Sequence, residues 1–337
     1  MKRNMKLWVE EQIRADKKNP LPILSFPCTQ LLGIKVSELV ASSELQAKGM
    51  AAVAERTPMS ASVSFMDLSV EAECFGATIH LSDNEVPTVT GALITEPEET
   101  DALEIPQIGA ARSGIYVEAI RRAAEIITDR PILAGAIGPF SLAGRLLDVS
   151  EAMILCYDEP EMVHTVLEKV SDFTINYCLA FKEAGANGIV LAEPLAGLLS
   201  PNLAAEFSHV YVKKIIDAVQ TDDFIVIYHN CGNNIALMKK DIYALGASGY
   251  HFGNAVRMAD MLTDSPDDVM IMGNVSPSEQ FLGGTPESIR TNTLEIMGEC
   301  CYKQNYIISS GCDIPPKSSW DNIDAFFAAA DEFYSAK

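Results

Sequence analysis

The chain alternates between short, β-rich apolar runs and longer segments whose apolar residues recur with helical spacing. This alternation constrains the fold more than any other feature, because it is typical of βαβ units that build a parallel sheet. We expect strands at residues 23–26, 62–68, 132–136, 188–192, 224–228, 249–252, 269–272 and 306–309. The spacing predicts helices over residues 161–184, 201–219 and 286–302, the last two beginning at the pairs Ser200-Pro201 and Thr285-Pro286.

Eight strands that alternate with helices, without an intervening linker, favour an α/β fold of the closed (β/α)₈ TIM barrel type. The length of 337 residues fits a barrel of ~250 residues with insertions. We therefore expect one domain over residues 1–337, with an N-terminal helix over residues 1–20. Residues 70–110 are predicted to form an insertion after the second strand that contains a β-hairpin.

The charge balance excludes several classes of partner. There are 25 Lys and Arg against 46 Asp and Glu, which gives a formal net charge of −21. A nucleic-acid site requires clustered cations, and the sequence has no such cluster.

No apolar stretch approaches the ~20 residues of a membrane-spanning helix, and the start of the chain lacks the apolar run of a signal peptide. We expect a cytoplasmic protein with reduced thiols that are available for metals or chemistry.

Polar residues follow the predicted strand at residues 224–228. His229 and Cys231 are two positions apart, so in an extended chain their side chains point the same way. An imidazole nitrogen and a thiolate that converge at a barrel mouth are ligands that zinc prefers. A His-x-Cys pair alone is a weak signal, and an incidental pair remains the alternative.

Two more strand ends carry groups suited to the same ion. Cys312 follows the last predicted strand, and Glu193 follows the strand at residues 188–192. Together with His229 and Cys231 they form a mixed nitrogen, sulfur and oxygen set suited to Zn²⁺. The alternative is that Glu193 is a capping or paired acid and Cys312 a small buried residue.

Several short motifs, spread over most of the chain, carry a family resemblance. They are Met66–Glu73 with Phe75-Gly76-Ala77, Gly138-Pro139-Phe140, Ala192-Glu193-Pro194, His229-Asn230-Cys231-Gly232, Gly273-Asn274-Val275-Ser276-Pro277 and Gly311-Cys312-Asp313-Ile314-Pro315-Pro316. The chain resembles the uroporphyrinogen decarboxylase superfamily, in particular its zinc-dependent corrinoid methyltransferase branch. The His-x-Cys and late Cys elements are the parts specific to that branch.

The resemblance implies a ligand set and a reaction. His229, Cys231 and Cys312 would bind zinc, with Glu193 as a fourth ligand that the acceptor thiol displaces. The methyl donor would be a methylated corrinoid held by a separate corrinoid protein, and the acceptor a small-molecule thiol such as coenzyme M. A free thiol, with a pKa of ~8.5, is mostly protonated near neutral pH, and coordination to a metal deprotonates it.

Further candidate residues lie outside the three shared ligands. Asp67 matches a substrate-binding Asp of the decarboxylases and, with Glu193, is a candidate catalytic residue. Asn274, in a motif shared across the superfamily, is a candidate for cofactor binding. His251 follows a predicted strand at the barrel mouth and is a second candidate, which would bond a substrate or orient a ligand, while a structural His251 is at least as compatible. Asp313 stands where the resemblance leads us to expect a small residue, and it is a competing fourth ligand, a group that orients a ligand, or a helix cap.

Two alternative functions remain. Decarboxylation of a tetrapyrrole is the first, but it requires cations for the substrate carboxylates, and no Arg occurs between Arg14 and Arg56. The intact set of His229, Cys231 and Cys312 is also unexplained by that reaction. A non-catalytic corrinoid-protein binding role is the second, and the same intact ligand set argues against it.

Overall fold

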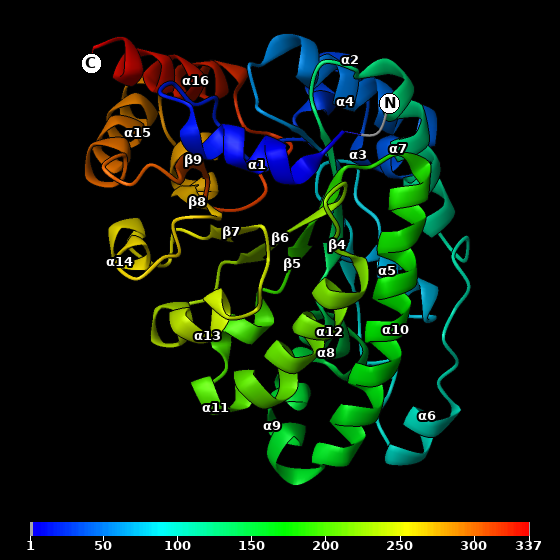
Figure 1. Cartoon of the computed structure of the whole chain (residues 1–337). Helices are drawn as coiled ribbons and strands as arrows, with labels where there is room; N and C mark the ends of the chain where they lie inside the picture. Colours follow the sequence, from blue (N-terminus) through cyan, green and yellow to red (C-terminus); the bar gives the residue numbers. More distant parts are fainter. Residues whose placement is uncertain (1–2, 337) are drawn as a thin grey trace.

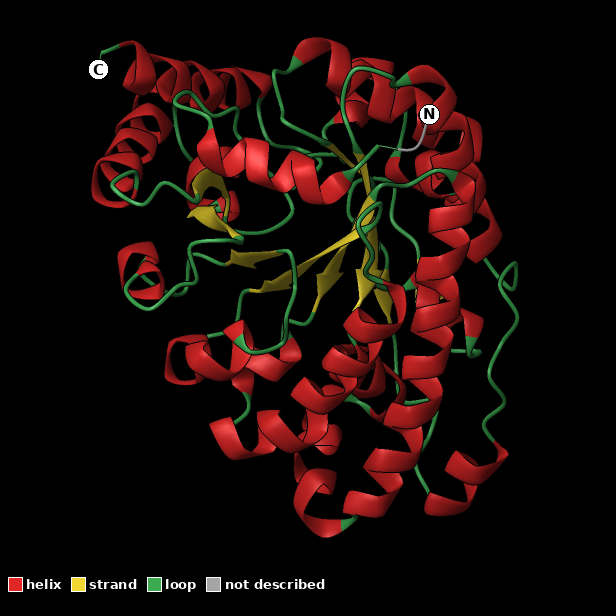
Figure 2. Cartoon of the chain, viewed as in Figure 1, coloured by secondary structure: helices red, strands yellow, loops and turns green. Residues whose placement is uncertain are grey.

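The computed structural model describes residues 3–336 and is built around one sheet of parallel strands. In spatial order these are β1 (Ser62–Val63), β4 (Ile132–Ile137), β5 (Gly188–Ala192), β6 (Ile225–Asn230), β7 (Gly249–Phe252), β8 (Met270–Val275) and β9 (Tyr306–Ser310). Figure 2 shows the strands gathered in the middle of the molecule with helices around them. The curled sheet confirms the predicted barrel-like α/β fold.

The strands are apolar on both faces because both faces are covered. Every residue of β5 and of β6 is buried, and such strands form continuous hydrophobic runs rather than alternating patterns. Neighbouring strands are in parallel register, with Ala192 opposite His229 and His229 opposite His251. This register brings the carboxyl ends of β5, β6 and β7 to one end of the barrel.

The strand predicted at residues 23–26 is absent, and this expectation is wrong. The segment instead runs as irregular chain between β9 and β1. The Leu21 amide donates to the Ile308 carbonyl at 3.1 Å, and the Ser60 amide donates to the Pro20 carbonyl at 3.2 Å. Pro20 and Pro22 have no amide hydrogen, so a regular ladder cannot continue through them. The segment still occupies the place of an eighth strand.

Helices cover the outside of the sheet (Figure 1). The longer ones are α4 (Ser43–Arg56), α7 (Ser113–Ile126), α8 (Pro139–Leu147), α9 (Val149–Asp158), α10 (Pro160–Ala184), α12 (Val210–Val219), α15 (Pro286–Cys300) and α16 (Trp320–Ser335). The shorter ones are α2 (Cys28–Leu32), α3 (Val36–Val40), α11 (Pro201–Ala204), α13 (Lys239–Tyr243) and α14 (Met258–Leu262). In Figure 1, α15 and α16 pack side by side next to the C-terminus.

Two of the three predicted helices are continuous, and one is interrupted. Residues 161–184 lie in α10 and residues 286–300 form α15, whose first turn is capped by Thr285. Residues 201–219 divide into α11, a π-helical turn at Ala205–His209, and α12. The apolar spacing continues through a π turn, so the sequence pattern does not reveal the interruption.

The predicted insertion contains α5 (Val70–Cys74), the antiparallel hairpin of β2 (Ile79–His80) and β3 (Thr88–Val89), and α6 (Pro97–Ala102). This arrangement confirms the hairpin. The N-terminal helix α1 spans Met5–Arg14, shorter than predicted, and contacts β8. Within residues 3–336, no helix combines the length and the apolar character needed to cross a membrane.

Candidate metal centre

Three of the predicted ligands converge at the carboxyl ends of β6 and β9. His229 is the penultimate residue of β6, Cys231 directly follows that strand, and Cys312 follows β9. Their potential ligand atoms all lie within 4.8 Å of one another, and His229 Nε2 is 3.4 Å from Cys312 Sγ. The structure therefore brings together one imidazole and two thiols from distant parts of the sequence.

The turn after β6 positions Cys231. Asn230 Oδ1 accepts a hydrogen bond from the Gly232 amide at 2.9 Å, and Asn230 Nδ2 donates to the Tyr228 hydroxyl at 2.9 Å. Gly253, after β7, packs directly on the cysteine, because a Cβ at this position would lie 2.4 Å from Cys231 Cβ. A larger residue at position 253 would displace the cysteine from the group.

A chain of hydrogen bonds, which we call the histidine relay, orients His229. The relay consists of His229, His251, Ser309 and the Leu21 carbonyl. Ser309 Oγ donates to the Leu21 carbonyl at 2.7 Å and lies 2.7 Å from His251 Nε2. His251 Nδ1 in turn lies 2.8 Å from His229 Nδ1.

The carbonyl end of the relay determines the tautomer of each histidine. A carbonyl only accepts, so Ser309 donates to Leu21, and its Oγ accepts from His251 Nε2–H. Burial and the neighbouring His229 lower the pKa of His251 well below its usual range, so this ring is neutral. His251 Nδ1 is then an acceptor and His229 Nδ1–H the donor. His229 Nε2 is left without a proton, as a metal ligand requires.

The sequence made His251 a candidate for cofactor binding, with a structural role as the alternative, and did not point to Ser309. The only local signal for Ser309 is a pair of polar residues at the end of an otherwise apolar strand, β9. His251 is buried behind His229 and does not line the adjoining cavity. The structure therefore places His251 as a hydrogen-bond partner of His229 and not on the wall of the cavity.

The two thiols of the group are in hydrogen-bond contact and affect each other's ionisation. The contact with Cys312 lowers the pKa of Cys231, whereas the same contact and burial raise the pKa of Cys312 to about 12. The contact between the two thiols therefore favours ionisation of one of the pair over ionisation of both. Both side chains are only partly buried, so they remain accessible from the barrel mouth.

A cavity of about 470 Å³ adjoins the three ligands. Most of its lining is apolar, from residues such as Met66, Leu68 and Pro315. The charged residues among those that line it are Glu85, Asp313 and Lys317. Asp313 Oδ1 is buried without a hydrogen-bond partner among the described residues, and burial raises the pKa of this carboxyl well above its usual range.

Glu193 does not join the three ligands. Its Oε1 accepts from the Ser141 amide at 3.0 Å, at the start of α8. A Cβ at Gly138 would lie 1.6 Å from Glu193 Oε2, so only glycine fits there. Ala192, the preceding residue, lines the cavity, and successive residues of a strand face opposite sides. Glu193 therefore faces α8, where burial raises its pKa to about 8.

Asp67 lies in a second buried polar cluster at the same end of the barrel, which we call the Asp67 network. Its members are Asp67, Ser69, Glu73, Arg112 and Tyr116. Asp67 is ion-paired with Arg112 and accepts from the Tyr116 hydroxyl at 2.7 Å and from Ser69 Oγ at 2.5 Å. Arg112 Nε also contacts Glu73 at 2.6 Å. Asp67 is not among the residues that line the cavity.

Asn274 holds a loop next to the metal centre. Its Nδ2 donates to the carbonyls of Gly253 and Val256, at 2.9 Å and 2.8 Å. Gly253 is the residue that packs on Cys231. The structure thus connects Asn274 to the cysteine through the backbone of the loop after β7.

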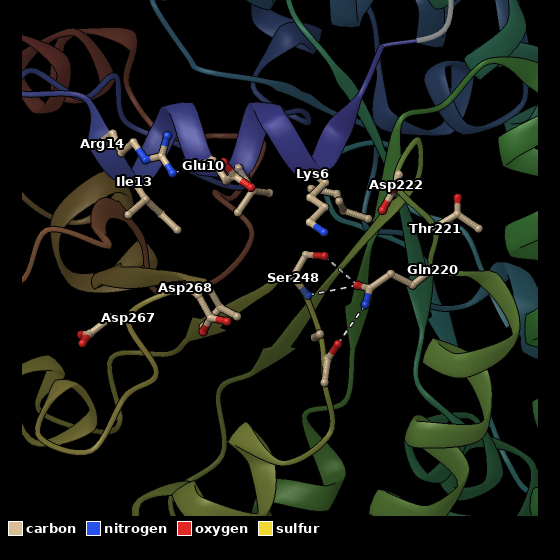
Figure 3. A pocket seen from close by; sticks show the side chains of 15 residues that line it. Lys6, Glu10, Ile13, Arg14, Gln220, Thr221, Asp222, Ser248, Asp267 and Asp268 are labelled. Atoms are coloured by element: carbon tan, nitrogen blue, oxygen red, sulfur yellow. Dashed lines mark hydrogen bonds and ion pairs between the residues drawn. The ribbon is translucent and has the colours of Figure 1, made fainter.

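A second cavity, of about 610 Å³, lies at the opposite end of the barrel, beneath α1 (Figure 3). It is lined by α1 and by the segments that precede β6, β7 and β8. None of the candidate site residues lines it. Gln220 spans its wall, accepting from Ser248 and donating to the Gly246 carbonyl. Its amide group is therefore part of the framework.

The fold and the three converging ligands define a barrel-like α/β protein with a thiol- and imidazole-containing centre at the carboxyl ends of its strands. Residues 24–333 match the family model for uroporphyrinogen decarboxylase (URO-D). The chain belongs to this family.

Relatives within the family carry two different activities in their names. Methylcobamide:CoM methyltransferase MtbA of Methanosarcina acetivorans is 28% identical over 274 residues, which cover 79% of this chain and 78% of the relative. A uroporphyrinogen decarboxylase of Pseudoalteromonas translucida is 25% identical over 299 residues, which cover 84% and 81%. A solved methyltransferase from Methanosarcina mazei superposes with a TM-score of 0.85 at 24% identity, over 98% of this chain and 99% of that one. This last similarity shows the fold.

Proposed function

We propose that this protein is a zinc-dependent methyltransferase that transfers a methyl group from a methylated corrinoid to a small-molecule thiol such as coenzyme M. The observation that carries the proposal is the convergence of His229, Cys231 and Cys312 within 4.8 Å beside a cavity. The relatives named methylcobamide:CoM methyltransferase support the reaction class.

The donor set fits zinc. Two thiols and one imidazole are preferred zinc ligands, and three protein ligands leave one position for a substrate, as in catalytic zinc sites. The histidine relay leaves His229 Nε2 with a free lone pair directed toward Cys312. Bound by these three residues, zinc would supply the positive charge that lowers the pKa of the acceptor thiol.

The residues of the chain have separate tasks in the proposed reaction. His229, Cys231 and Cys312 hold the metal, and His251 and Ser309 orient His229. The largely apolar cavity receives the acceptor and limits water around its sulfur. The thiol would release its proton to solvent, its sulfur would bond to the methyl carbon of the donor corrinoid, and the carbon–cobalt bond would break with its electron pair left on the corrinoid.

The corrinoid is proposed to reach the site on a separate corrinoid protein that docks at the barrel mouth. Leu198, Leu237 and Leu282 follow β5, β6 and β8 and are 44%, 73% and 46% exposed. Each of the three leucines lies in a short helical turn that follows its strand, and exposed apolar side chains at the rim of a barrel mouth would suit contact with another protein. Leu282 also lines the cavity, so a partner on this rim would face the acceptor.

Metal analysis combined with methyl transfer tests the proposal. We expect the purified protein to contain about one zinc per chain and to demethylate methylcobalamin only when a thiol is present. The product is measured as cobalt(I) corrinoid by its absorbance and as thioether by mass spectrometry. Absence of zinc, or absence of demethylation with every thiol of a panel, would contradict the proposal. Conversion of uroporphyrinogen by the same protein would instead support the decarboxylase activity.

A further inference from the structure

We propose that Arg145 and the small cavity beside it form a binding site for an oxyanionic group, a carboxylate or a phosphate, separate from the metal centre. The site goes beyond the methyl transfer proposed above and does not depend on it. The proposal is carried by the lack of an acidic partner for Arg145, by the cavity that this residue lines and by the small volume of that cavity.

Arg145 differs from most arginines of the chain in having no acidic partner. Eight others have a carboxylate oxygen within 4 Å: Arg14, Arg56, Arg112, Arg121, Arg122, Arg130, Arg257 and Arg290. Among the described residues Arg145 has none, and its side chain makes its hydrogen bond from Nε to the Leu68 carbonyl at 2.8 Å. An arginine has five N–H donors, so the two Nη groups of Arg145 remain available to a ligand.

The charge of Arg145 is partly desolvated and lacks a direct counterion. Burial lowers the pKa of Arg145, but an arginine keeps its proton in a protein. The carboxyls of Asp67, Glu71 and Glu193 are near it, yet none is within ion-pair distance, and each accepts a hydrogen bond from another residue. A partly buried charge without a partner is costly, and a bound anion would remove that cost.

Arg145 lines a cavity of about 180 Å³ between α8, the start of α9 and the hairpin of β2 and β3. This cavity adjoins the one at the metal centre. Leu68 and Val86 line the larger cavity, and the residues that follow them, Ser69 and Pro87, line the smaller one. A group bound beside Arg145 would therefore contact the same hairpin that borders the metal centre.

The acidic residue on the wall of the small cavity is Asp148, and its carboxylate is directed to α9. Asp148 Oδ1 accepts from the Ser150 and Glu151 amides, at 2.9 Å and 3.4 Å, and so caps the first turn of that helix. A carboxylate held by two amides repels a neighbouring anion less than a free one, because the amide dipoles offset part of its charge.

The hairpin adds a backbone donor to the opposite wall. The Thr90 amide donates to the Thr78 carbonyl at 2.9 Å, and Val89 is paired with Ile79 at the next position. Hydrogen-bonded and non-hydrogen-bonded pairs alternate in an antiparallel ladder, so the Val89 amide points away from β2. Val89 lines the small cavity, which therefore has a donor on the wall facing α8 that β2 does not use.

The volume limits the ligand to a small group. Sites for whole small molecules usually have ~300–1,000 Å³, and this cavity is smaller. A carboxylate or a phosphate group is small enough, and each supplies the several acceptor oxygens that a guanidinium group binds at once. The ligand is therefore a free oxyanion or one acidic group of a larger molecule.

Thermal unfolding in two oxyanions tests the site. The purified protein is titrated with sodium phosphate and, separately, with sodium acetate at pH 7, while sodium chloride keeps the ionic strength constant. The melting temperature is recorded for the wild type, Arg145→Gln, Arg145→Lys and Arg290→Gln. Arg290 is the matched control, because it is exposed and ion-paired with Glu332. Zinc content is measured after each titration, since loss of zinc to phosphate would lower the melting temperature rather than raise it.

We expect at least one of the two oxyanions to raise the melting temperature of the wild type by about 2–4 °C, with saturation at an apparent Kd of about 1 mM. The ratio of the two Kd values then distinguishes a phosphate ligand from a carboxylate ligand. Arg145→Gln should lose the saturable shift, because the charge and the Nη donors are both removed, and Arg290→Gln should behave like the wild type. Arg145→Lys keeps the charge without the planar fork and should weaken the apparent Kd about 10-fold.

Two results would overturn the proposal. The first is a wild-type melting temperature that rises without saturation, or does not rise, in both salts. The second is a saturable shift that persists unchanged in Arg145→Gln or, if that variant does not fold, in Arg145→Lys. Neither result would affect the methyltransferase proposal, which depends on zinc and on the three ligands.

Discussion

The histidine relay and the Asp67 network are both buried, hydrogen-bonded clusters at the carboxyl end of the barrel, but they end differently. The relay begins at a backbone carbonyl and ends on His229 Nε2, an unprotonated nitrogen that faces a thiol and the cavity. In the Asp67 network, Arg112 contacts the carboxylates of both Asp67 and Glu73. The Asp67 oxygens also accept hydrogen bonds from the Ser69 and Tyr116 hydroxyls.

This difference distinguishes a cluster that can take part in chemistry from a cluster that stabilises the fold. A buried polar cluster serves chemistry when one of its groups remains available to an outside partner, and it serves stability when its groups satisfy one another. By this criterion His229 belongs to a reactive centre, whereas Asp67 has little capacity left for a substrate. The expected effects of substitutions differ accordingly.

Removal of Cys312, the thiol that faces His229 Nε2, should have the largest effect. We expect Cys312→Ala to lower both zinc content and methyl transfer at least about 100-fold, more than the ~10–100-fold typical of residues that only orient ligands. Zinc by mass spectrometry and methylcobalamin demethylation are the two measurements. Cys300→Ala is the matched control, because that thiol is buried in α15, outside the ligand group, and it should retain zinc. Full activity in Cys312→Ala would remove the metal centre from the reaction.

Asp67→Asn should affect stability rather than metal binding. The substitution leaves Arg112, which is only 8% exposed, without its buried partner, and loss of one member of such a pair costs about 3–5 kcal/mol. The remaining contact with Glu73 favours the lower end of that range. Urea denaturation measures the change, and zinc content should not change.

The control for Asp67→Asn is Glu73→Gln. This change removes the more exposed of the two carboxylates that contact Arg112, and it should lower the free energy of unfolding by about 1 kcal/mol or less. A different result would change the interpretation of the network. If Asp67→Asn kept its stability but lost methyl transfer, Asp67 would be a catalytic residue, as the family resemblance suggests.

The contrast also shows what a sequence reveals about such a site. Six of the seven strands were predictable to within three residues because both of their faces are buried and their apolar runs are continuous. The run predicted as a strand at residues 62–68 forms one only at β1 (Ser62–Val63). The segment at residues 23–26 has the same apolar character, yet Pro20 and Pro22 interrupt its hydrogen bonding. His229, Cys231 and Cys312 were predictable because each directly follows, or ends, one of these apolar runs.

The orientation of Glu193 and the role of Ser309 could not be predicted from their positions at strand ends. Glu193 occupies the expected strand end but faces α8, and only the register of Ala192 with His229 reveals which side it faces. Ser309 acts through the carbonyl of Leu21, 288 residues away in the sequence. Partners so distant leave no periodic signal, so the relay became visible only in three dimensions.

His251→Phe should break the relay. His229 Nδ1 would lose the His251 ring nitrogen and keep only its longer contact, 3.3 Å, with the His251 backbone carbonyl, so the ring would be held less firmly. We expect zinc affinity, measured by competition with a chromogenic chelator, to fall about 10–100-fold. His251→Gln offers an amide oxygen to His229 and should recover part of the affinity. If the phenylalanine variant bound zinc as tightly as the wild type, His251 would have no part in positioning His229.

The smallest effect concerns Glu71, a buried carboxyl near Asp67, which tests whether the polar groups on the Asp67 side matter only for stability. Burial raises its pKa to about 7, although its Oε1 accepts from the Ile137 amide at 2.9 Å. The native state therefore holds a proton that the unfolded state, with a pKa near ~4.3, has already released. The stabilisation contributed by Glu71 should be fully present below pH ~4.3 and should be lost as pH rises toward 7, by up to ~1.4 kcal/mol per pH unit.

Glu71→Gln keeps the acceptor for Ile137 and removes the titration. Urea unfolding at pH 5, 6, 7 and 8 should therefore show a smaller loss of stability with pH in the variant than in the wild type. Zinc content should be the same in both proteins, since Glu71 is not one of the three ligands. Parallel pH profiles would mean that Glu71 is ionised in the native state, and its second carboxyl oxygen, which has no partner among the described residues, would then require a bound water or ion. A loss of zinc in Glu71→Gln would instead mean that the polar groups around Asp67 and Glu71 also support metal binding by His229, Cys231 and Cys312.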